Sequence, residues 1–139
     1  MSRPAPARSA STNLVSGAGA QRSLEGKVAL VTGGSRGIGK AVCENLAAKG
    51  CSLLINYTSD NSTAKTAEFA SRLESTHGIK ALPVQADMGT ENGPAHIIST
   101  ALNHFAHPKT RKLQLDIIIN NAGVAKTGPI ESITPDVFA

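Results

Sequence analysis

The residues best suited to chemistry form a glycine-rich segment, residues 32–39, with the sequence Thr-Gly-Gly-Ser-Arg-Gly-Ile-Gly. It follows an apolar run at residues 28–31 that is typical of a buried strand, and it leads into a helical segment that ends at Gly50. Unpaired backbone N–H groups and the positive end of the helix dipole meet at such a turn and attract anions. Because glycines allow close approach and Arg36 adds a cation, the segment predicts a site for the diphosphate of a dinucleotide.

Two other interpretations of this segment stay open. One is an ordinary glycine-rich turn between a strand and a helix. The other is the phosphate loop of a nucleoside triphosphatase, because residues 34–40 spell G-x-x-x-x-G-K. The next residue, Ala41, lacks the hydroxyl that such a loop uses to bind magnesium, which disfavours this interpretation.

The end of the second predicted strand, residues 51–57, bears on the choice of cofactor. Sites for NAD commonly carry an acidic residue about 20 residues beyond the glycines, where it binds the ribose hydroxyls. Here the corresponding positions are Asn56, Tyr57, Thr58 and Ser59, and the nearest acid, Asp60, falls in the following turn. A carboxylate would repel a 2′-phosphate, whereas Arg36 and hydroxyl groups would bind it, so the sequence favours NADP (NADPH) over NAD.

Histidine and cysteine give no sign of a metal site. His96, His104 and His107 have no carboxylate or cysteine partners at ligand spacing, and we expect them to face solvent. Cys43 and Cys51 lack the C-x-x-C spacing and resemble the reduced, buried thiols of an intracellular protein.

Apolar periodicity predicts alternating strands and helices after the first strand. Further strands are expected at residues 51–57, at residues 81–85 with Pro83 marking a sheet edge, and at residues 116–120, the last buried on both faces. Helices are expected near residues 40–50, 61–76 and 90–105. The side chains expected to face the sheet are Ile38, Ala41, Val42 and Leu46 in the first helix, Ala67, Ala70 and Leu73 in the second, and Ile97, Ile98, Ala101, Leu102 and Phe105 in the third.

Charge and length limit the possible partners. The chain has 139 residues and a net charge of +4, and Arg3, Arg8 and Arg22 precede every acidic residue. Without these three, 11 of the 14 basic residues remain against 10 acidic ones, and with one tyrosine, three phenylalanines and no tryptophan the domain is a poor nucleic-acid surface. No apolar run is long enough to cross a bilayer, so we expect a soluble, cytoplasmic protein without a membrane partner.

The first 23 residues are rich in Ser, Ala, Pro, Gly and Arg and contain no acid. We expect a disordered extension at residues 1–23, followed by one cofactor-binding unit at residues 24–139. A mitochondrial transit segment is the alternative, because such segments are rich in Arg and Ser, although Pro4 and Pro6 oppose a helix there.

Two motifs resemble those of the short-chain dehydrogenase/reductase family. The first is G-x-x-x-G-x-G from Gly33 to Gly39 with Thr32 in front, and the second is Asn-Asn-Ala-Gly at residues 120–123, directly after a predicted strand. Residues 24–31 and 55–57 look most like 3-oxoacyl-carrier-protein reductases and fungal ketoreductases. The resemblance implies an α/β fold, a Rossmann-type doubly wound parallel sheet of strand order 3-2-1-4, here incomplete and stopping in the helix after the fourth strand.

The resemblance also implies roles for individual residues. Asp87 would contact the adenine through its carboxylate and Met88 through its backbone, while Asn120 would tie neighbouring strands together. The full set of predicted cofactor-binding residues is Gly33, Ser35, Arg36, Gly37, Ile38, Gly39, Asn56, Tyr57, Thr58, Asp87, Met88, Asn121, Ala122 and Gly123.

The implied activity is NADPH-dependent reduction of a small-molecule carbonyl or acyl substrate, of 3-oxoacyl or polyketide-like type, to an alcohol. Family chemistry uses a Tyr-x-x-x-Lys sequence, but the one tyrosine, Tyr57, is followed four residues later by Asn61, so no catalytic residue is named. We therefore expect the cofactor half of a longer reductase that is a homo-oligomer at full length. The alternative is a non-catalytic dinucleotide-binding or dimerising module.

Overall fold

Four short runs rich in valine, isoleucine and leucine form one parallel sheet. The structure, a computed structural model, describes residues 21–123. Its strands are β1 (Val28–Val31), β2 (Ser52–Tyr57), β3 (Ala81–Gln85) and β4 (Ile117–Ile119), in the order β3-β2-β1-β4. The predicted parallel sheet, its order and the edge position of β3 are confirmed, while the expectations for residues 1–20 and 124–139 lie outside the described residues.

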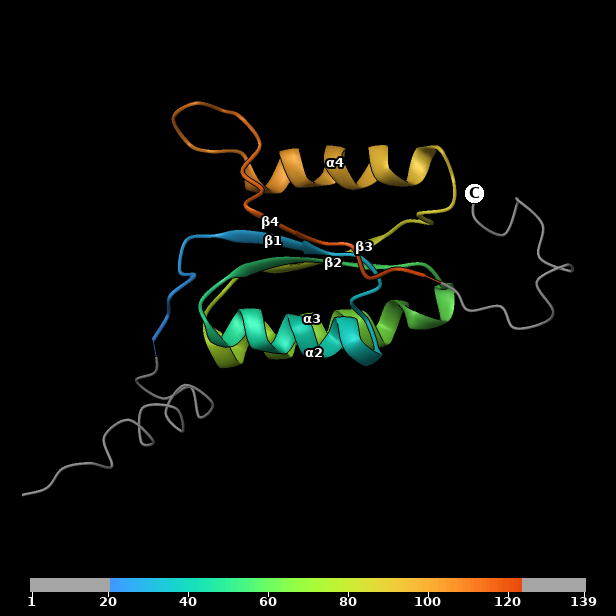
Figure 1. Ribbon diagram of the computed structural model, residues 1–139, viewed down its shortest axis with the longest axis horizontal. Coiled ribbons are helices and arrows are strands. Elements are labelled where there is room, and N and C mark those ends of the chain that lie inside the picture. The colour runs from blue at the N-terminus through green and yellow to red at the C-terminus, as the bar shows by residue number, and fades with distance from the viewer. Residues whose placement is uncertain (1–20, 124–139) are drawn as a thin grey trace, which may run out of the picture.

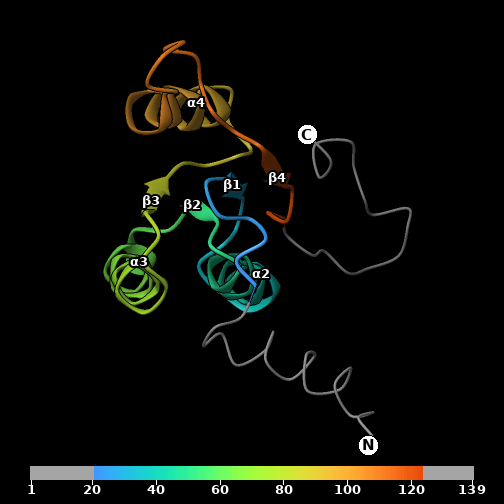
Figure 2. The same cartoon turned by 90° about the vertical axis from the view of Figure 1, so that its left-hand side faces the viewer.

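Helices cover the sheet on both faces. α2 (Gly37–Ala48) and α3 (Thr63–His77) lie on one face, and α4 (Asn92–Phe105) lies on the other, as Figures 1 and 2 show. A short 3-10 turn, η1 (Asp60–Ser62), leads from β2 into α3. This alternation of strand and helix is what parallel strands require, because each crossover must return the chain to the same end of the sheet.

The two faces of the sheet supply two separate apolar cores. On one face, Val31, Leu53 and Ile55 pack with Cys43 of α2 and Leu73 of α3. On the other face the core combines strand residues with α4, namely Val28, Leu30, Leu54, Val84, Ile97, Ala101 and Phe105. Neighbouring strand residues point to opposite faces, so the continuous apolar strands fill both cores.

The inward face of α2 differs from the prediction. Its buried residues are Gly39, Cys43 and Ala47, which recur every four positions and form a narrow stripe of small side chains. Val42 and Leu46 are partly buried against the core, as predicted, but Ala41 is exposed and Ile38 is 76% exposed, so their predicted inward positions are wrong. Small residues let the helix approach the sheet closely, which turns the larger side chains towards its flanks.

Similar corrections apply to the other helices and to β4. In α3, Thr66 and Phe69 are buried with Ala70 and Leu73, whereas Ala67 is exposed. In α4, Ile97, Ala101 and Phe105 face the core as predicted, but the other two predicted inward residues, Ile98 and Leu102, are each 43% exposed. β4 is not buried on both faces, because Ile118 is 53% exposed on this edge strand of the described sheet.

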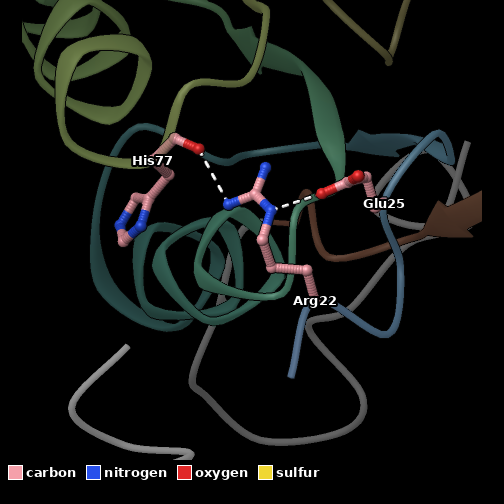
Figure 3. A network of polar contacts seen from close by, with 3 residues as sticks. All are labelled: Arg22, Glu25 and His77. Atoms are coloured by element: carbon pink, nitrogen blue, oxygen red, sulfur yellow. Dashed lines mark hydrogen bonds and ion pairs between the residues drawn. The ribbon is translucent and has the colours of Figure 1, made fainter. Parts of the chain in front are cut away.

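The segment before β1 is attached to the carboxyl ends of two helices. Arg22 pairs with Glu25, and its Nη1 donates a hydrogen bond of 2.9 Å to the backbone oxygen of His77 at the end of α3 (Figure 3). The backbone N–H of Leu24 donates to the carbonyl of Lys49, just after α2, at 2.9 Å. These bonds satisfy carbonyl groups that a helix leaves without partners at its last turn.

None of the helices within residues 21–123 has both the length and the apolar character needed to span a bilayer.

Candidate functional site

The glycine loop leaves β1 and turns back beneath the end of β2. The backbone N–H of Gly33 donates to the side-chain oxygen of Asn56 at 3.1 Å, and that of Gly34 donates to the Asn56 carbonyl at 2.9 Å. Gly33 and Gly37 have φ angles of 63° and 58°, in the left-handed region where a side chain is strained. The loop therefore needs glycine at both positions to bring the chain into α2.

Gly39 is required by close packing within the protein. A β-carbon there would lie 2.2 Å from the carbonyl oxygen of Gly33 and 2.6 Å from the side-chain nitrogen of Asn121. At Gly37, apart from its chain neighbours and the nearby backbone of α2, no atom of the described residues lies within 4 Å of the equivalent point. The loop thus packs tightly on its protein side and stays open on the other, which leaves its backbone accessible to a ligand.

The first turn of α2 has hydrogen-bond donors free for an anion. The N-cap residue, Arg36, is extended and makes no side-chain cap, and the first turn contains no acidic residue. The first N–H groups of a helix have no partner within the helix, and the helix dipole adds positive potential there. With the Arg36 guanidinium at the same place, this end of α2 can hold a phosphate group.

Thr32 and Asn121 connect the glycine loop to the segment after β4. The Thr32 hydroxyl oxygen accepts hydrogen bonds from the backbone N–H groups of Asn121 and Ala122, both at 2.9 Å. The Asn121 amide donates to the carbonyls of Thr32 and Gly33, at 3.3 and 3.2 Å. Since Thr32 is only 2% exposed, these bonds are shielded from water and hold the two loops in one relative position.

An open cleft of about 1300 Å³ extends across the carboxyl ends of the strands. Open α/β sheets bind their ligands at this edge, and the volume exceeds the roughly 300–1,000 Å³ of a typical small-molecule pocket, which suits an elongated ligand. The described residues that line the cleft are Gly33, Ser35, Arg36, Gly37, Ile38, Tyr57, Thr58, Ser59, Asn61, Ser62, Lys65, Asp87, Met88, Gly89, Asn121, Ala122 and Gly123.

The lining includes all but two of the predicted cofactor-binding residues. The two exceptions, Gly39 and Asn56, lie behind the loop: Asn56 is fully buried and its amide donates to the Ala86 carbonyl at 3.0 Å. Ile38 lines the cleft, which agrees with its exposure and with its absence from the core.

Some lining residues were absent from the predicted set, namely Ser59, Asn61, Ser62, Lys65 and Gly89. Their position in the sequence could have indicated most of them, because the first turn of a helix that starts after β2 must lie beside the glycine loop. Among these residues, Lys65 is the one that carries a charge. It brings a second cation to the cleft, while Asp87 is the one acid among the described lining residues.

Asp87 also shapes its own loop. Its carboxylate accepts a hydrogen bond of 2.8 Å from the backbone N–H of Gly89, and its carbonyl accepts one of 2.8 Å from the Thr90 hydroxyl. The turn between β3 and α4 is therefore held in place next to the cleft, with one carboxylate oxygen engaged by the backbone.

Both cysteines are free, buried thiols. Burial raises the pKa of Cys43, which lies behind the glycine loop, to about 12, and it raises the pKa of Cys51 to about 11. Neither cysteine lines the cleft. His96, His104 and His107 are exposed, as predicted, and within residues 21–123 no three His, Cys, Asp or Glu side chains come together to hold a metal ion.

Comparison with known proteins supplies the family. The chain is 53% identical over 120 residues to L-xylulose reductase of Aspergillus niger, covering 79% of this chain and 40% of that protein. It is 45% identical over 109 residues to L-xylo-3-hexulose reductase of Hypocrea jecorina, covering 75% of this chain and 36% of that protein. The chain thus spans well under half the length of these curated relatives.

Solved structures agree with the fold. A blue fluorescent protein from a metagenomic library, crystallised in complex with NADPH, matches with a TM-score of 0.72 and 34% sequence identity, over 84% of this chain and 44% of that one. The family model for short chain dehydrogenases matches residues 27–139. The protein belongs to the short-chain dehydrogenase family.

Proposed function

We propose that this chain binds NADP(H) and forms the cofactor-binding part of a reductase that converts a ketone to an alcohol. The observation that carries the proposal is the cleft itself, which combines an uncapped helix N-terminus, an open glycine loop and no acid at the end of β2. The NADPH found in a related solved structure supports the same cofactor.

Each wall of the cleft suits a different part of the dinucleotide. The backbone N–H groups at the start of α2 are proposed to bind the diphosphate, and Arg36 and Lys65 are proposed to bind the 2′-phosphate. Asp87 and Met88 would contact the adenine, and residues 121–123 would contact the ribose next to the nicotinamide. When bound, the nicotinamide ring supplies the hydride.

Proton donation is proposed to come from the region of the relatives that this chain does not match. The 139 residues contain no Tyr-x-x-x-Lys sequence, and the curated relatives extend well beyond the matched region. The part played by the described residues is to bind and orient the cofactor and, through the Thr32–Asn121 connection, to fix the loop on which the ribose would lie.

The substrate class is proposed to be a small ketone. The relatives named above are reductases of ketoses, and versicolorin reductase of Emericella nidulans is 35% identical over 115 residues. A test panel therefore begins with L-xylulose and continues with an aromatic polyketide-like ketone and a 3-oxoacyl thioester.

The longer form is proposed to be a cytoplasmic homo-oligomer, with mitochondria as the alternative location. Light scattering tests the oligomeric state, and cell fractionation tests the location.

The decisive experiment measures binding and turnover together. Cofactor fluorescence during titration of the purified chain gives the dissociation constants for NADPH and NADH, and NADPH consumption with the ketone panel gives the activity. We expect NADPH to bind at least about tenfold more tightly than NADH, a difference of about 1.4 kcal/mol. We expect tight NADPH binding without turnover, because the 139 residues contain no Tyr-x-x-x-Lys sequence. Turnover by the isolated chain would contradict the proposal that proton donation comes from the region of the relatives that this chain does not match.

ATP is the control ligand in this titration. ATP binding stronger than NADPH binding would contradict the proposed dinucleotide site and support the phosphate-loop interpretation of residues 34–40. Failure to bind any of the three nucleotides would contradict a nucleotide site of either kind.

A further inference from the structure

A side-chain bridge joins the end of β3 to the loop after β2. Gln85 is the last residue of β3, and its side-chain nitrogen donates to the carboxylate of Asp60 at 2.6 Å and to the carbonyl of Thr58 at 3.0 Å. Both hydrogen bonds lie at the surface. A bond of this length to a carboxylate is charge-assisted and stronger than one between neutral groups.

The bridge changes which side chains the cleft presents. Ser59 and Asn61, on either side of Asp60, line the cleft, as do Thr58 and Ser62. Asp60 itself is not among the described lining residues, and its carboxylate accepts the hydrogen bond from Gln85 at the edge of the sheet. The same wall carries Lys65, so the loop shows a cation and hydroxyl groups to the cleft and keeps its acid outside.

This arrangement matters most for a 2′-phosphate. The loop at the end of β2 is where dinucleotide-binding folds discriminate between a ribose hydroxyl and a 2′-phosphate. A carboxylate free to turn into this wall would repel the phosphate and could accept hydrogen bonds from the ribose hydroxyls of the unphosphorylated cofactor. The difference in binding free energy between the two cofactors comes from the charge of one carboxylate. It therefore depends on where the Asp60 carboxylate is held.

We propose that Gln85 is a positioning residue that favours the phosphorylated cofactor by holding the Asp60 carboxylate out of the cleft. The inference rests on the proposed dinucleotide function and adds to it a determinant of cofactor choice that does not itself touch the cofactor. It differs from a purely structural role for Gln85, which would stabilise the loop for either cofactor equally.

The test compares Gln85→Met, Asp60→Asn and the double variant, with Gln21→Ala as a control at an exposed glutamine before β1. Methionine keeps the length of the side chain and removes the donor. We expect Gln85→Met to weaken NADPH binding by about threefold to tenfold, the size of one nearby charge in a solvated site, and to leave NADH binding unchanged or stronger. In the double variant, NADPH affinity should return to within about twofold of the parent chain, since no charge remains to repel the phosphate.

Salt gives an independent readout. The selectivity change in Gln85→Met should shrink as the ionic strength rises to about 1 M, where the screening length is about 3 Å. Equal weakening of both cofactors by Gln85→Met, or no recovery in the double variant, would show that Gln85 has only a structural role. If the parent chain binds NADPH normally and Gln85→Met does not change the selectivity between NADPH and NADH, this inference alone is overturned. If the parent chain binds neither cofactor, the proposed function is overturned as well.

Discussion

Three uncharged polar side chains hold the glycine loop in its conformation. Thr32, Asn56 and Asn121 each bond to the backbone of residues 32–34 or 119–122, and Thr32 and Asn56 are buried. A buried polar group that loses its partner costs more than the bond itself contributes, so these side chains constrain the loop strongly. These three side chains therefore preorganise the cleft. Asn56 and Asn121 belong to the predicted cofactor-binding set, whereas Thr32 does not.

Thr32→Val tests this arrangement. Valine has the same shape but cannot accept the hydrogen bonds from the N–H groups of Asn121 and Ala122. We expect the free energy of unfolding, measured by urea denaturation, to fall by about 1–3 kcal/mol. Thr32→Ser keeps the hydroxyl and is the matched control, with an expected loss well below that of valine. Equal losses in both variants would contradict the importance of the hydrogen bonds and point to packing of the methyl group.

Lys65→Gln tests the second cation of the cleft. Lys65 lines the cleft from the first turn of α3, and glutamine keeps its polarity without its charge. Loss of a solvated charge next to a phosphate should weaken NADPH binding by about fivefold and leave NADH binding within about twofold. The control is Lys27→Gln, at an exposed lysine before β1. A parallel loss for both cofactors would show that Lys65 does not interact with the 2′-phosphate.

The edge strand β4 is joined to β1 by a side-chain bond at its start. The Asp116 carboxylate accepts a hydrogen bond of 2.9 Å from the backbone N–H of Val28, and one of 3.2 Å from the Gln114 amide. The bond from Val28 is the main cause that lowers the pKa of Asp116 below its ordinary value, and Gln114 and Lys27 add to it. Sequence patterns cannot reveal this bond, because it joins residues 88 positions apart.

The lowered pKa of Asp116 predicts a dependence of stability on pH. Because the unfolded chain takes up this proton more readily than the folded one, the contribution is present at neutral pH and is lost as the pH falls below about 4. Urea denaturation at several pH values should show a shallower acid-side decline for Asp116→Asn than for the parent chain. Identical slopes would mean that Asp116 titrates normally in the folded state.

The narrow inward face of α2 predicts unreactive thiols. Cys43 and Cys51 are fully buried, and burial raises the pKa of both thiols well above pH 8, so the reactive thiolate form is disfavoured in the folded chain. An aromatic disulfide reagent should therefore label neither cysteine in the folded chain at pH 8 and should label both promptly in guanidinium chloride. Rapid labelling under native conditions would contradict the described packing of α2 and β2 against the core.

The sheet order and the place of the cleft could be predicted from the chain, but much of the side-chain arrangement could not. The glycine motif and the Asn-Asn-Ala-Gly motif each follow an apolar strand. They therefore locate β1, β4 and the edge of the sheet that carries the cleft. Strand order 3-2-1-4 followed from family resemblance, since periodicity alone says nothing about which strands pair.

The errors have a common physical origin. Periodicity assigned Ile38, Ile98 and Leu102 to the core because they are large and apolar, yet all three are exposed. α2 packs through small residues, and α4 packs through the neighbouring stripe of Gly93, Ile97, Ala101 and Phe105. Periodicity also could not show that the side chain of Asn56, one of the predicted cofactor-binding residues, is buried and bonds to the backbone of the glycine loop and of residue 86. The way each helix packs on the sheet decides which of its residues are buried, and that is a property of the packed molecule.

Backbone amide shifts provide the most direct measurement of where the cofactor lies. In a titration of the isotopically labelled chain with NADPH, followed by NMR, we expect shifts to cluster at the amides of residues 33–39, with further changes at residues 87–89 and 121–123. The amides of α4, on the other face of the sheet, should stay unchanged. Saturable shifts on α4, or none in the glycine loop at concentrations where NADPH binds, would contradict the assignment of this cleft as the dinucleotide site.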